Sequence, residues 1–326
     1  MVDLNVARES WPIRGSFTIS RGSRTTAEVV VVELSDGTHA GRGECVPYPR
    51  YDETVEGVIA EIEGLRDALA KGLDRHALQD RLPAGAARNA LDCAFWDLEA
   101  KQAGKRVWEL AGLPEPGPVP TAYTLSLDTP ARMAVSAKDN AERPLLKLKL
   151  SGPDDLDRVA AVRSNAPDAR LIVDANEGWT ADQYRNLSEE LRELGVDMIE
   201  QPLPASDDEG LAGIARPVPV CADESCHDRA SLEALAGKYD MVNIKLDKTG
   251  GLTEALALKA EAEAAGFAVM VGCMLATSLA MAPAVLLGQE VEIVDLDGPL
   301  LLAKDRDDAL TFEGSFIHPP SGRLWG

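Results

Sequence analysis

Cysteine pairs and positive charge are what this 326-residue chain lacks most clearly. Its five cysteines are odd in number, and none stands in a Cys-x-x-Cys pair or in the spacing of a disulfide framework. This excludes a disulfide-stapled scaffold and fits a protein of the reducing cytoplasm. Basic residues number 33 against 54 acidic residues, a formal net charge of −21. Because that charge repels nucleic acid and anionic membranes, a small molecule or a metal ion is the expected partner.

Leader and membrane signals are also weak. The first ten residues contain no apolar stretch behind a basic one, so we expect no signal peptide. Residues 266–289 form an uncharged run long enough to span a bilayer. Acidic residues flank this run and Pro283 interrupts it, so we interpret it as a strand followed by a buried helix. No membrane partner is expected.

The first third of the chain combines short strands with helices. Residues 14–20, 28–34 and 39–44 have the pattern of strands, and Ser35-Asp36-Gly37 is a turn signal between the last two. From Asp52 onward, and again over residues 86–103, apolar residues recur at helical spacing. These features predict an α+β capping domain over residues 1–115, followed by a Pro/Gly-rich linker at residues 113–120.

The sequence pattern changes after the linker. Short apolar runs alternate with helical segments, such as residues 153–164 and 252–265. This alternation predicts an α/β fold, a (β/α)7β TIM-like barrel over residues 116–299, with the tail 300–326 returning to the capping domain. An open doubly wound sheet is the competing fold, but no Gly-x-Gly-x-x-Gly motif follows the first run. The eight expected strands are residues 119–127, 145–150, 170–176, 197–202, 219–225, 241–246, 268–273 and 291–297.

Two lysines stand in the apolar run Leu-Leu-Lys-Leu-Lys-Leu at residues 145–150. Strand side chains alternate, so Lys147 and Lys149 share one face. Burial and mutual repulsion both disfavour adjacent cations, and we therefore expect at least one amine to have a lowered pKa and to serve as a base. The alternative is an exposed edge strand with solvated lysines.

Acidic residues end three successive runs, at Asp174, Glu200 and Asp223. The carboxyl ends of parallel barrel strands meet at one mouth, so these carboxylates are expected to converge. Three oxygen ligands without cysteine or histidine suit Mg²⁺. Each residue alone could be a helix cap or a turn former, but three in consecutive strands favour a metal site. Lys149 on the second strand and Lys245 on the sixth are expected on opposite sides of the mouth.

The Lys-x-Lys pair, the three strand-ending carboxylates and the Asn-Ile-Lys-Leu segment at residues 243–246 resemble the muconate-lactonising-enzyme subgroup of the enolase superfamily. The resemblance covers nearly the whole chain, from the capping domain to the returning tail. It implies one Mg²⁺ per subunit on the three carboxylates. It also implies that Lys149 and Lys245 are catalytic bases and that Lys147 is a second cation beside the substrate.

Two further features resemble the dipeptide epimerases of that subgroup. Asp295-Leu-Asp297 matches the Asp-x-Asp pair that receives the α-ammonium of a dipeptide, although a strand-ending turn could have the same sequence. Residues 20–28 and 43–51 resemble the cap loops of L-alanyl-D/L-glutamate epimerases, in which Arg24 or Arg21 could pair with a substrate carboxylate or remain a surface charge. The resemblance gives substrate contacts to Thr124, Cys273 and Leu275, and supporting roles to Asn176, Glu224, Asp247 and Lys248.

The implied reaction is Mg²⁺-dependent epimerisation of a dipeptide at the α-carbon of its C-terminal residue, with L-Ala-L-Glu or L-Ala-D-Glu as substrate. Two bases on opposite faces would move the proton through a metal-stabilised enediolate. The lysines alone leave open a lyase of the o-succinylbenzoate synthase or muconate cycloisomerase kind, or an N-acylamino acid racemase. A further alternative is a barrel that binds metal and ligand without turnover. The expected setting is the cytoplasm and murein peptide metabolism, and a homo-oligomer is compatible with the sequence.

Overall fold

An antiparallel sheet opens the computed structural model, which describes residues 2–152 and 154–326. Strands β1 (Asp3–Ile19), β2 (Gly22–Ser35) and β3 (Ala40–Cys45) lie in that order. The predicted meander is present, but its first strand begins at Asp3 rather than at residue 14. β1 lies at the edge of the sheet, and most of its side chains are exposed. Because many of its residues are polar, the sequence pattern does not identify the first half of this strand.

Helix α4 (Ala86–Ala103) packs directly on this sheet. A Cβ atom at Gly43 of β3 would lie 2.1 Å from the carbonyl oxygen of Ala90, and one at Gly41 would lie 2.2 Å from that of Ala94. Only glycine therefore allows the strand and the helix to approach this closely. The other helical elements of this part are η1 (Pro49–Tyr51), α1 (Val55–Glu63), α2 (Arg66–Ala70), α3 (Arg75–Arg81) and α5 (Val107–Leu110).

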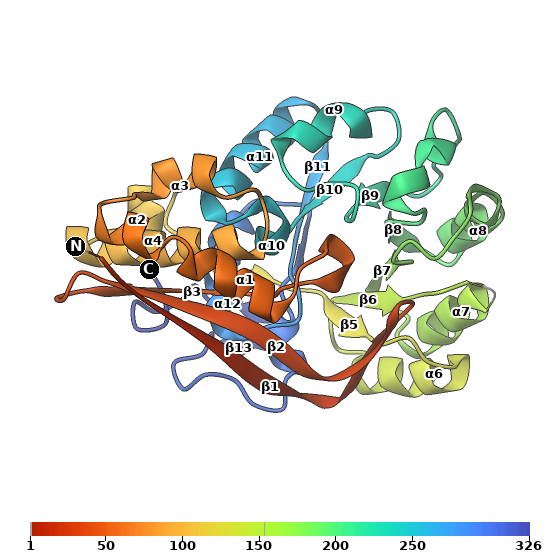
Figure 1. The fold of residues 1–326 in the computed structure, drawn as a ribbon. Helices are drawn as coiled ribbons and strands as arrows, with labels where there is room; N and C mark the ends of the chain where they lie inside the picture. Colours follow the sequence, from red (N-terminus) through yellow and green to blue (C-terminus); the bar gives the residue numbers. More distant parts are fainter. Residues whose placement is uncertain (1, 153) are drawn as a thin grey trace.

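Eight parallel strands follow one another around a nearly closed barrel, which confirms the predicted fold (Figure 1). The first and last strands meet where the backbone N–H of Ala122 donates to the carbonyl of Val294 at 2.8 Å. The strands are β5 (Tyr123–Leu125), β6 (Leu145–Lys149), β7 (Arg170–Asp174), β8 (Val196–Glu200), β9 (Val220–Ala222), β10 (Met241–Ile244), β11 (Ala268–Gly272) and β12 (Ile293–Asp295). One cluster of apolar side chains draws a residue from each strand or its flank: Ala122, Leu145, Ile172, Met198, Cys221, Met241, Met270 and Ile293.

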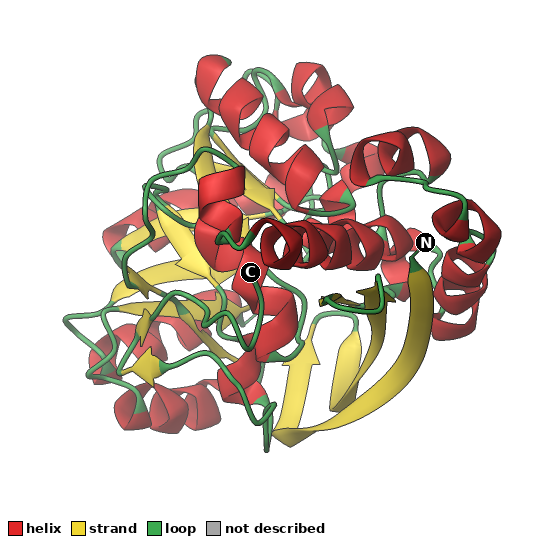
Figure 2. Ribbon diagram, turned by 90° about the vertical axis from the view of Figure 1, so that its left-hand side faces the viewer, coloured by secondary structure: helices red, strands yellow, loops and turns green. Residues whose placement is uncertain are grey.

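Helices follow most strands and surround the barrel (Figure 2). Between β8 and β9 the structure describes only the short turns η2 (Ala205–Asp207) and η3 (Glu209–Leu211). The helix expected at residues 153–164 is α7, and Pro153 lies outside the described residues. The others are α6 (Pro130–Asp139), α7 (Asp155–Asn165), α8 (Ala181–Glu193), η4 (Arg229–Ser231), α9 (Leu232–Leu235), α10 (Leu246–Thr249), α11 (Leu252–Ala264) and α12 (Ser278–Leu287).

Two expected runs have a more detailed structure than predicted. The run at residues 119–127 is divided between β4 (Val119–Pro120), which pairs outside the barrel, and β5. The uncharged run at residues 266–289 contains β11 and α12, as expected. Among the described residues, no helix combines the length and the apolar composition needed to cross a membrane.

The C-terminal tail returns to the N-terminal part of the chain. It consists of α13 (Gly298–Leu301), β13 (Phe312–Glu313) and β14 (Phe316–Ile317), and β14 pairs with β4. The indole N–H of Trp325 donates to the carbonyl of Cys93 on α4 at 3.0 Å. The two chain ends consequently lie on the same side of the molecule (Figure 1). The domain boundaries at residues 115 and 299 stay predictions.

Candidate active site

Three carboxylates meet at the carboxyl ends of neighbouring barrel strands. Asp174 ends β7, Glu200 ends β8, and Asp223 directly follows β9. All three are buried, and one oxygen from each lies within 4.8 Å of the other two. The structure thus brings together the residues that the sequence predicted as a group. Three hard oxygen donors without cysteine or histidine fit Mg²⁺ or a similar hard cation.

Two lysine amines contact this cluster from different sides of the barrel. Lys149 Nζ, at the end of β6, lies 2.6 Å from Asp174 Oδ2. Lys245 Nζ, directly after β10, lies 2.5 Å from Asp223 Oδ2. Because β6 and β10 are four strands apart in a barrel of eight, the amines approach the mouth from opposite sides, as predicted.

Neither Lys245 nor Lys147 has the lowered pKa that the sequence led us to expect. Burial alone would lower the pKa of Lys245, but the charges of Asp223 and Glu200 outweigh burial and raise that pKa. At Lys147 burial also opposes the charge, and three surrounding carboxylates raise the pKa well above its ordinary value. The prediction considered the neighbouring cations and missed that each amine faces carboxylates. A divalent cation on these carboxylates would add the opposite charge and so act to lower the amine pKa values.

Two of the expected supporting residues hold the carboxylates in place. Lys248 Nζ contacts Asp223 Oδ1 at 2.6 Å. The backbone N–H of Asn176 donates to Asp174 Oδ1 at 2.8 Å. Both residues therefore act on the orientation of the cluster, as the resemblance implied.

Two further residues with this function were missed in the sequence. Asn243 Nδ2 donates to Glu200 Oε1 at 2.7 Å. Its position two residues before Lys245, on the same face of the strand, was the signal that could have identified it. Gln201 Oε1 accepts the backbone N–H of Asp223 at 2.9 Å. A glutamine next to a strand end carries no comparable signal.

A second pair of carboxylates lies at the end of β12. Asp295 Oδ2 lies 2.7 Å from Lys147 Nζ, and Asp295 Oδ1 has no hydrogen-bond partner in the described part of the chain. Asp297 accepts the backbone N–H of Thr124 at 2.6 Å, which places that expected contact residue beside the pair. Burial and the charge of Asp295 raise the pKa of Asp297 to about 7. Two neighbouring buried carboxylates suit a cationic guest.

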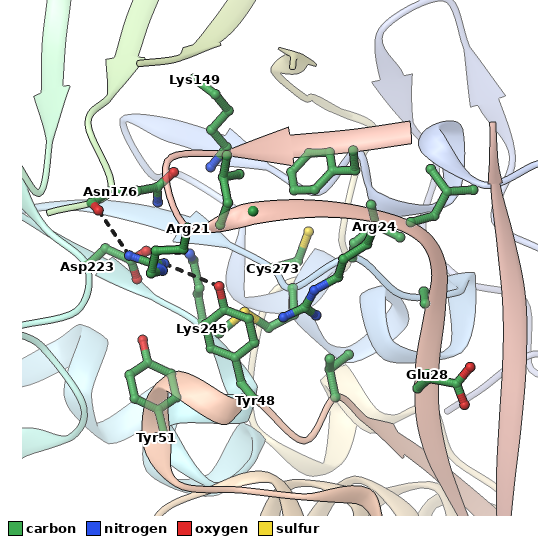
Figure 3. Close-up of a pocket in the computed structure, with 18 of the residues that line it drawn as sticks. Arg21, Arg24, Glu28, Tyr48, Tyr51, Lys149, Asn176, Asp223, Lys245 and Cys273 are labelled. Carbon is green, nitrogen blue, oxygen red and sulfur yellow. Dashed lines mark hydrogen bonds and ion pairs between the residues drawn. The ribbon is translucent and has the colours of Figure 1, made fainter. Parts of the chain in front are cut away.

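A cavity of about 90 Å³ lies between the barrel mouth and the β1–β2 hairpin (Figure 3). Both Lys149 and Lys245 line it, as do the expected contact residues Cys273 and Leu275. Apolar side chains of the hairpin complete the wall: Ile13, Phe17 and Ile19. A small molecule in this cavity would therefore contact both amines and be covered by the N-terminal sheet.

The two candidate arginines of the hairpin have different partners. Arg21 Nη2 lies 2.8 Å from Glu224 Oε1 and donates to Tyr48 Oη, so its charge is already paired (Figure 3). Arg24 lines the same cavity with its guanidinium 5.2 Å from the centre of the Tyr48 ring. No described residue forms an ion pair with Arg24. Arg24 is thus available to pair with a negatively charged group of a ligand in this cavity.

The remaining expected supporting residues differ from each other. Glu224 lines the cavity, and burial together with the charges of Asp223 and Asp174 raises its pKa to about 7. Asp247 has hydrogen-bond partners other than the carboxylate cluster, so its expected supporting role stays a prediction. It lies on α10, where strand alternation no longer applies, and its Oδ1 accepts the backbone N–H of Val46 at 2.9 Å. Asp247 therefore joins the barrel to the segment after β3.

Family profiles match both parts of the chain. The profile of the mandelate racemase / muconate lactonizing enzyme N-terminal domain matches residues 1–112, and the enolase C-terminal domain-like profile matches residues 131–323. The chain belongs to the mandelate racemase / muconate lactonizing enzyme family. Within this family, an L-Ala-D/L-Glu epimerase of Escherichia coli (strain K12) is 51% identical over 320 residues, which cover 98% of this chain and 100% of that protein. An N-acetyl-D-glutamate racemase of a Pseudoalteromonas species is 45% identical over 300 residues, covering 91% and 95%.

Solved structures of mandelate racemase / muconate lactonizing enzyme relatives repeat the fold. An enolase family member from Agrobacterium tumefaciens, solved with sodium and L-Ala-L-Glu, superposes with a TM-score of 0.98 at 55% identity over 100% of both chains. A dipeptide epimerase from Enterococcus faecalis V583, in complex with Mg and L-Leu-L-Tyr, superposes with a TM-score of 0.91 at 28% identity over 99% of this chain and 98% of that one. The predicted family and fold are therefore confirmed.

Proposed function

We propose that this protein is a Mg²⁺-dependent isomerase that epimerises dipeptides at the α-carbon of the C-terminal residue. The observation that carries the proposal is the placement of Lys149 and Lys245, whose amines lie 2.6 Å from Asp174 and 2.5 Å from Asp223 at two sides of one cluster. With a base on each face of the α-carbon, one amine removes the proton and the other returns a proton to the opposite face. The configuration is then inverted.

Proton removal next to a carboxylate requires stabilisation of negative charge, because it leaves a dianionic enediolate. Asp174, Glu200 and Asp223 would hold the Mg²⁺, which supplies positive charge beside the substrate carboxylate when bound. From the chain itself, Lys147 adds a buried cation at the same place. The β1–β2 hairpin covers the mouth and limits the access of water to the reacting carbon.

The carboxylates at the end of β12 support a dipeptide rather than a simple acid as substrate. Asp295 and Asp297 would bind its free α-ammonium, which offsets the repulsion between two buried carboxylates. Arg24 would pair with the side-chain carboxylate of a C-terminal glutamate. We therefore propose L-Ala-L-Glu and L-Ala-D-Glu as substrates, in agreement with the L-Ala-D/L-Glu epimerase that is 51% identical and with the L-Ala-L-Glu bound in a solved relative that is 55% identical. The proposed setting is the cytoplasm, in the metabolism of murein peptides.

Deuterium exchange tests this function. The protein is incubated with L-Ala-L-Glu in D₂O with Mg²⁺, and the α-proton of the glutamate is followed by NMR. We expect loss of that signal and appearance of L-Ala-D-Glu, loss of both effects after chelation by EDTA, and recovery on addition of Mg²⁺. If no exchange occurred across a panel of dipeptides with Mg²⁺ present, the proposal would be wrong.

Racemisation of N-acylated glutamate is the second candidate, because a relative with that name is 45% identical to this chain. The two buried carboxylates Asp295 and Asp297 argue against it, since an N-acyl group brings no cation to them. The ratio of kcat/KM for L-Ala-L-Glu to that for N-acetyl-L-glutamate decides between the candidates. A lyase, or a barrel without turnover, would epimerise neither compound.

A further inference from the structure

Glu177 lies outside the proposed chemistry but joins the barrel to two segments of the N-terminal part. Its carboxylate accepts two hydrogen bonds from Arg50, at 2.7 Å from Nε and at 2.7 Å from Nη2. It also lies 3.3 Å from Arg21 Nη1 and accepts the backbone N–H of Ala205 at 2.8 Å. Only 9% of the Glu177 side chain is exposed, so solvent screens these contacts weakly.

The partners of Glu177 come from three separate segments around the mouth. Arg50 lies on η1, Arg21 at the turn of the β1–β2 hairpin, and Ala205 at the start of η2 after β8. The hairpin turn has a second attachment at the same place, because Arg21 Nη1 donates to the carbonyl oxygen of Asn176 (Figure 3). Ser20 Oγ donates to the same oxygen. The loop after β7 is therefore the point to which both segments are fastened.

The backbone of this loop is strained in a way that serves these contacts. Asn176 and Glu177 have φ angles of 45° and 66°, in the left-handed region that residues with a side chain rarely adopt. Two hydrogen bonds hold the conformation: Asn176 N–H donates to Asp174 Oδ1, and Glu177 N–H donates to the carbonyl of Gln201. Such strain persists only where the surroundings determine it. The orientation of Glu177 thus depends on the hydrogen bond between Asn176 and Asp174.

The same contacts extend to the arginine that faces the cavity. Arg21 Nη2 donates to Tyr48 Oη at 3.2 Å, and the Arg24 guanidinium lies over the Tyr48 ring. Tyr48 precedes η1, the element that carries Arg50. Glu177 therefore contacts Arg50 directly, and through Arg21 it reaches Tyr48, whose ring lies under the Arg24 guanidinium.

We propose that Glu177 is a positioning residue that fastens the hairpin turn and η1 over the barrel mouth, and that through Tyr48 it fixes Arg24 for an acidic substrate side chain. The fastening follows from the contacts alone, whereas the selectivity for acidic dipeptides rests on the proposed function. Burial alone would raise the pKa of Glu177, but the hydrogen bonds from Arg50 and Ala205 lower it, so the carboxylate is charged at neutral pH. The pairing with both arginines is then available under ordinary conditions.

Four variants test the proposal: Glu177→Gln, Arg50→Gln, the double variant and Glu254→Gln. Glu254→Gln is the matched control, because Glu254 on α11 pairs with Arg229 at 3.0 Å and does not line the cavity. Amide hydrogen exchange of residues 14–28 and 46–53 measures the fastening without any substrate. Steady-state kinetics with L-Ala-L-Glu and with a neutral dipeptide, L-Ala-L-Leu, measure the selectivity.

We expect faster amide exchange in both segments for Glu177→Gln and for Arg50→Gln, with the double variant no faster than the stronger single one, because both break one pair. We also expect KM for L-Ala-L-Glu to rise by about tenfold, as for loss of a charge-assisted contact. The change in kcat, and the change in KM for L-Ala-L-Leu, should be smaller. Glu254→Gln should match the unmodified protein in both measurements.

Unchanged exchange in Glu177→Gln would overturn the fastening, and equal losses for the acidic and neutral dipeptides would overturn the role through Arg24. If Glu177→Gln does not fold by circular dichroism, Arg50→Gln breaks the same pair from the half-exposed side and decides in the same way. Failure of the proposed function would appear as an inactive unmodified protein, and the exchange measurement would still decide on the fastening.

Discussion

Lys147 Nζ lies 2.7 Å from Asp295 Oδ2, although the two residues are on β6 and β12. The same amine lies 2.6 Å from Glu200 Oε2. One buried cation therefore contacts both the cluster of Asp174, Glu200 and Asp223 and the carboxylates at the end of β12. Removing one partner of a buried ion pair leaves an uncompensated charge, and this typically costs about 3–5 kcal/mol. A single side chain thus links the site proposed for Mg²⁺ to the site proposed for the α-ammonium of the substrate.

Lys149→Ala and Lys245→Ala are each expected to abolish epimerisation, because each removes the base on one face. Each variant should still exchange the α-proton of one epimer in D₂O, and the two variants should differ in which epimer. NMR of both purified epimers provides the measurement. Lys259→Ala is the control, since that lysine pairs with Glu263 on the outside of α11. Full two-way turnover in either active-site variant would contradict the two-base scheme.

Asp297→Asn is expected to weaken binding of L-Ala-L-Glu more than binding of N-acetyl-L-glutamate. The substitution keeps an oxygen for the Thr124 N–H and removes the charge that would face an ammonium. Loss of one charged contact corresponds to roughly a 10- to 100-fold rise in KM. The measurement is KM for both compounds. Equal losses would show that no ammonium binds at Asp297.

Arg24→Gln is expected to raise KM for dipeptides with a C-terminal glutamate by roughly 10- to 100-fold, the effect of removing a charge-assisted pair. Dipeptides with a neutral C-terminal side chain should be affected much less. Arg132→Gln is the control, because Arg132 on α6 is 78% exposed and pairs only with Asp128 in the described structure. A similar loss with acidic and neutral dipeptides would remove the specificity role of Arg24.

The sequence predicted the residues whose position depends on strand order alone. Asp174, Glu200 and Asp223 end consecutive parallel strands, so their convergence follows from the barrel. The choice between Arg21 and Arg24 could not be made, because it depends on where distant carboxylates such as Glu177 lie. The contacts of Asp247 could not be predicted either, because they are made with Val46 and Asn89, which are distant in the sequence.

Asp247→Asn is expected to flatten the dependence of stability on pH. Burial raises the pKa of Asp247 from 3.8 to about 7 in the folded protein. The folded state therefore favours the protonated carboxyl group. The contribution of Asp247 to the free energy of unfolding is complete below the unfolded pKa and is lost as pH rises through the folded pKa. The variant should gain stability relative to the unmodified protein at pH 8, on the order of a few kcal/mol, and less at pH 4.

Urea unfolding at both pH values measures this gain. The exposed Asp168→Asn should leave the pH dependence unchanged. An Asp247→Asn variant with the same pH slope as the unmodified protein would mean that Asp247 is ionised at its buried position.

Gly43→Ala is expected to destabilise the protein by about 1–3 kcal/mol or more, because the added methyl group overlaps backbone that cannot move aside. The new Cβ would lie 2.1 Å from the carbonyl oxygen of Ala90 on α4. Gly117→Ala is the matched control, since no heavy atom lies within 4 Å of its Cβ position. Thermal unfolding of both variants provides the comparison. An unchanged midpoint for Gly43→Ala would mean that the helix can shift away from β3.

The contact of Gly41 and Gly43 with α4 gives the N-terminal sheet two mechanically different regions. Near α4 the strands are wedged against a helix and tolerate no added atom. At the hairpin turn no glycine is packed against other backbone in this way; Gly22 has open space around it, although its φ of 141° still favours glycine. Substitutions of the exposed residues 23–25 after Gly22 are therefore expected to cost less folding stability than substitutions of Gly41 or Gly43, so the turn can vary in sequence while the end packed on α4 keeps its position.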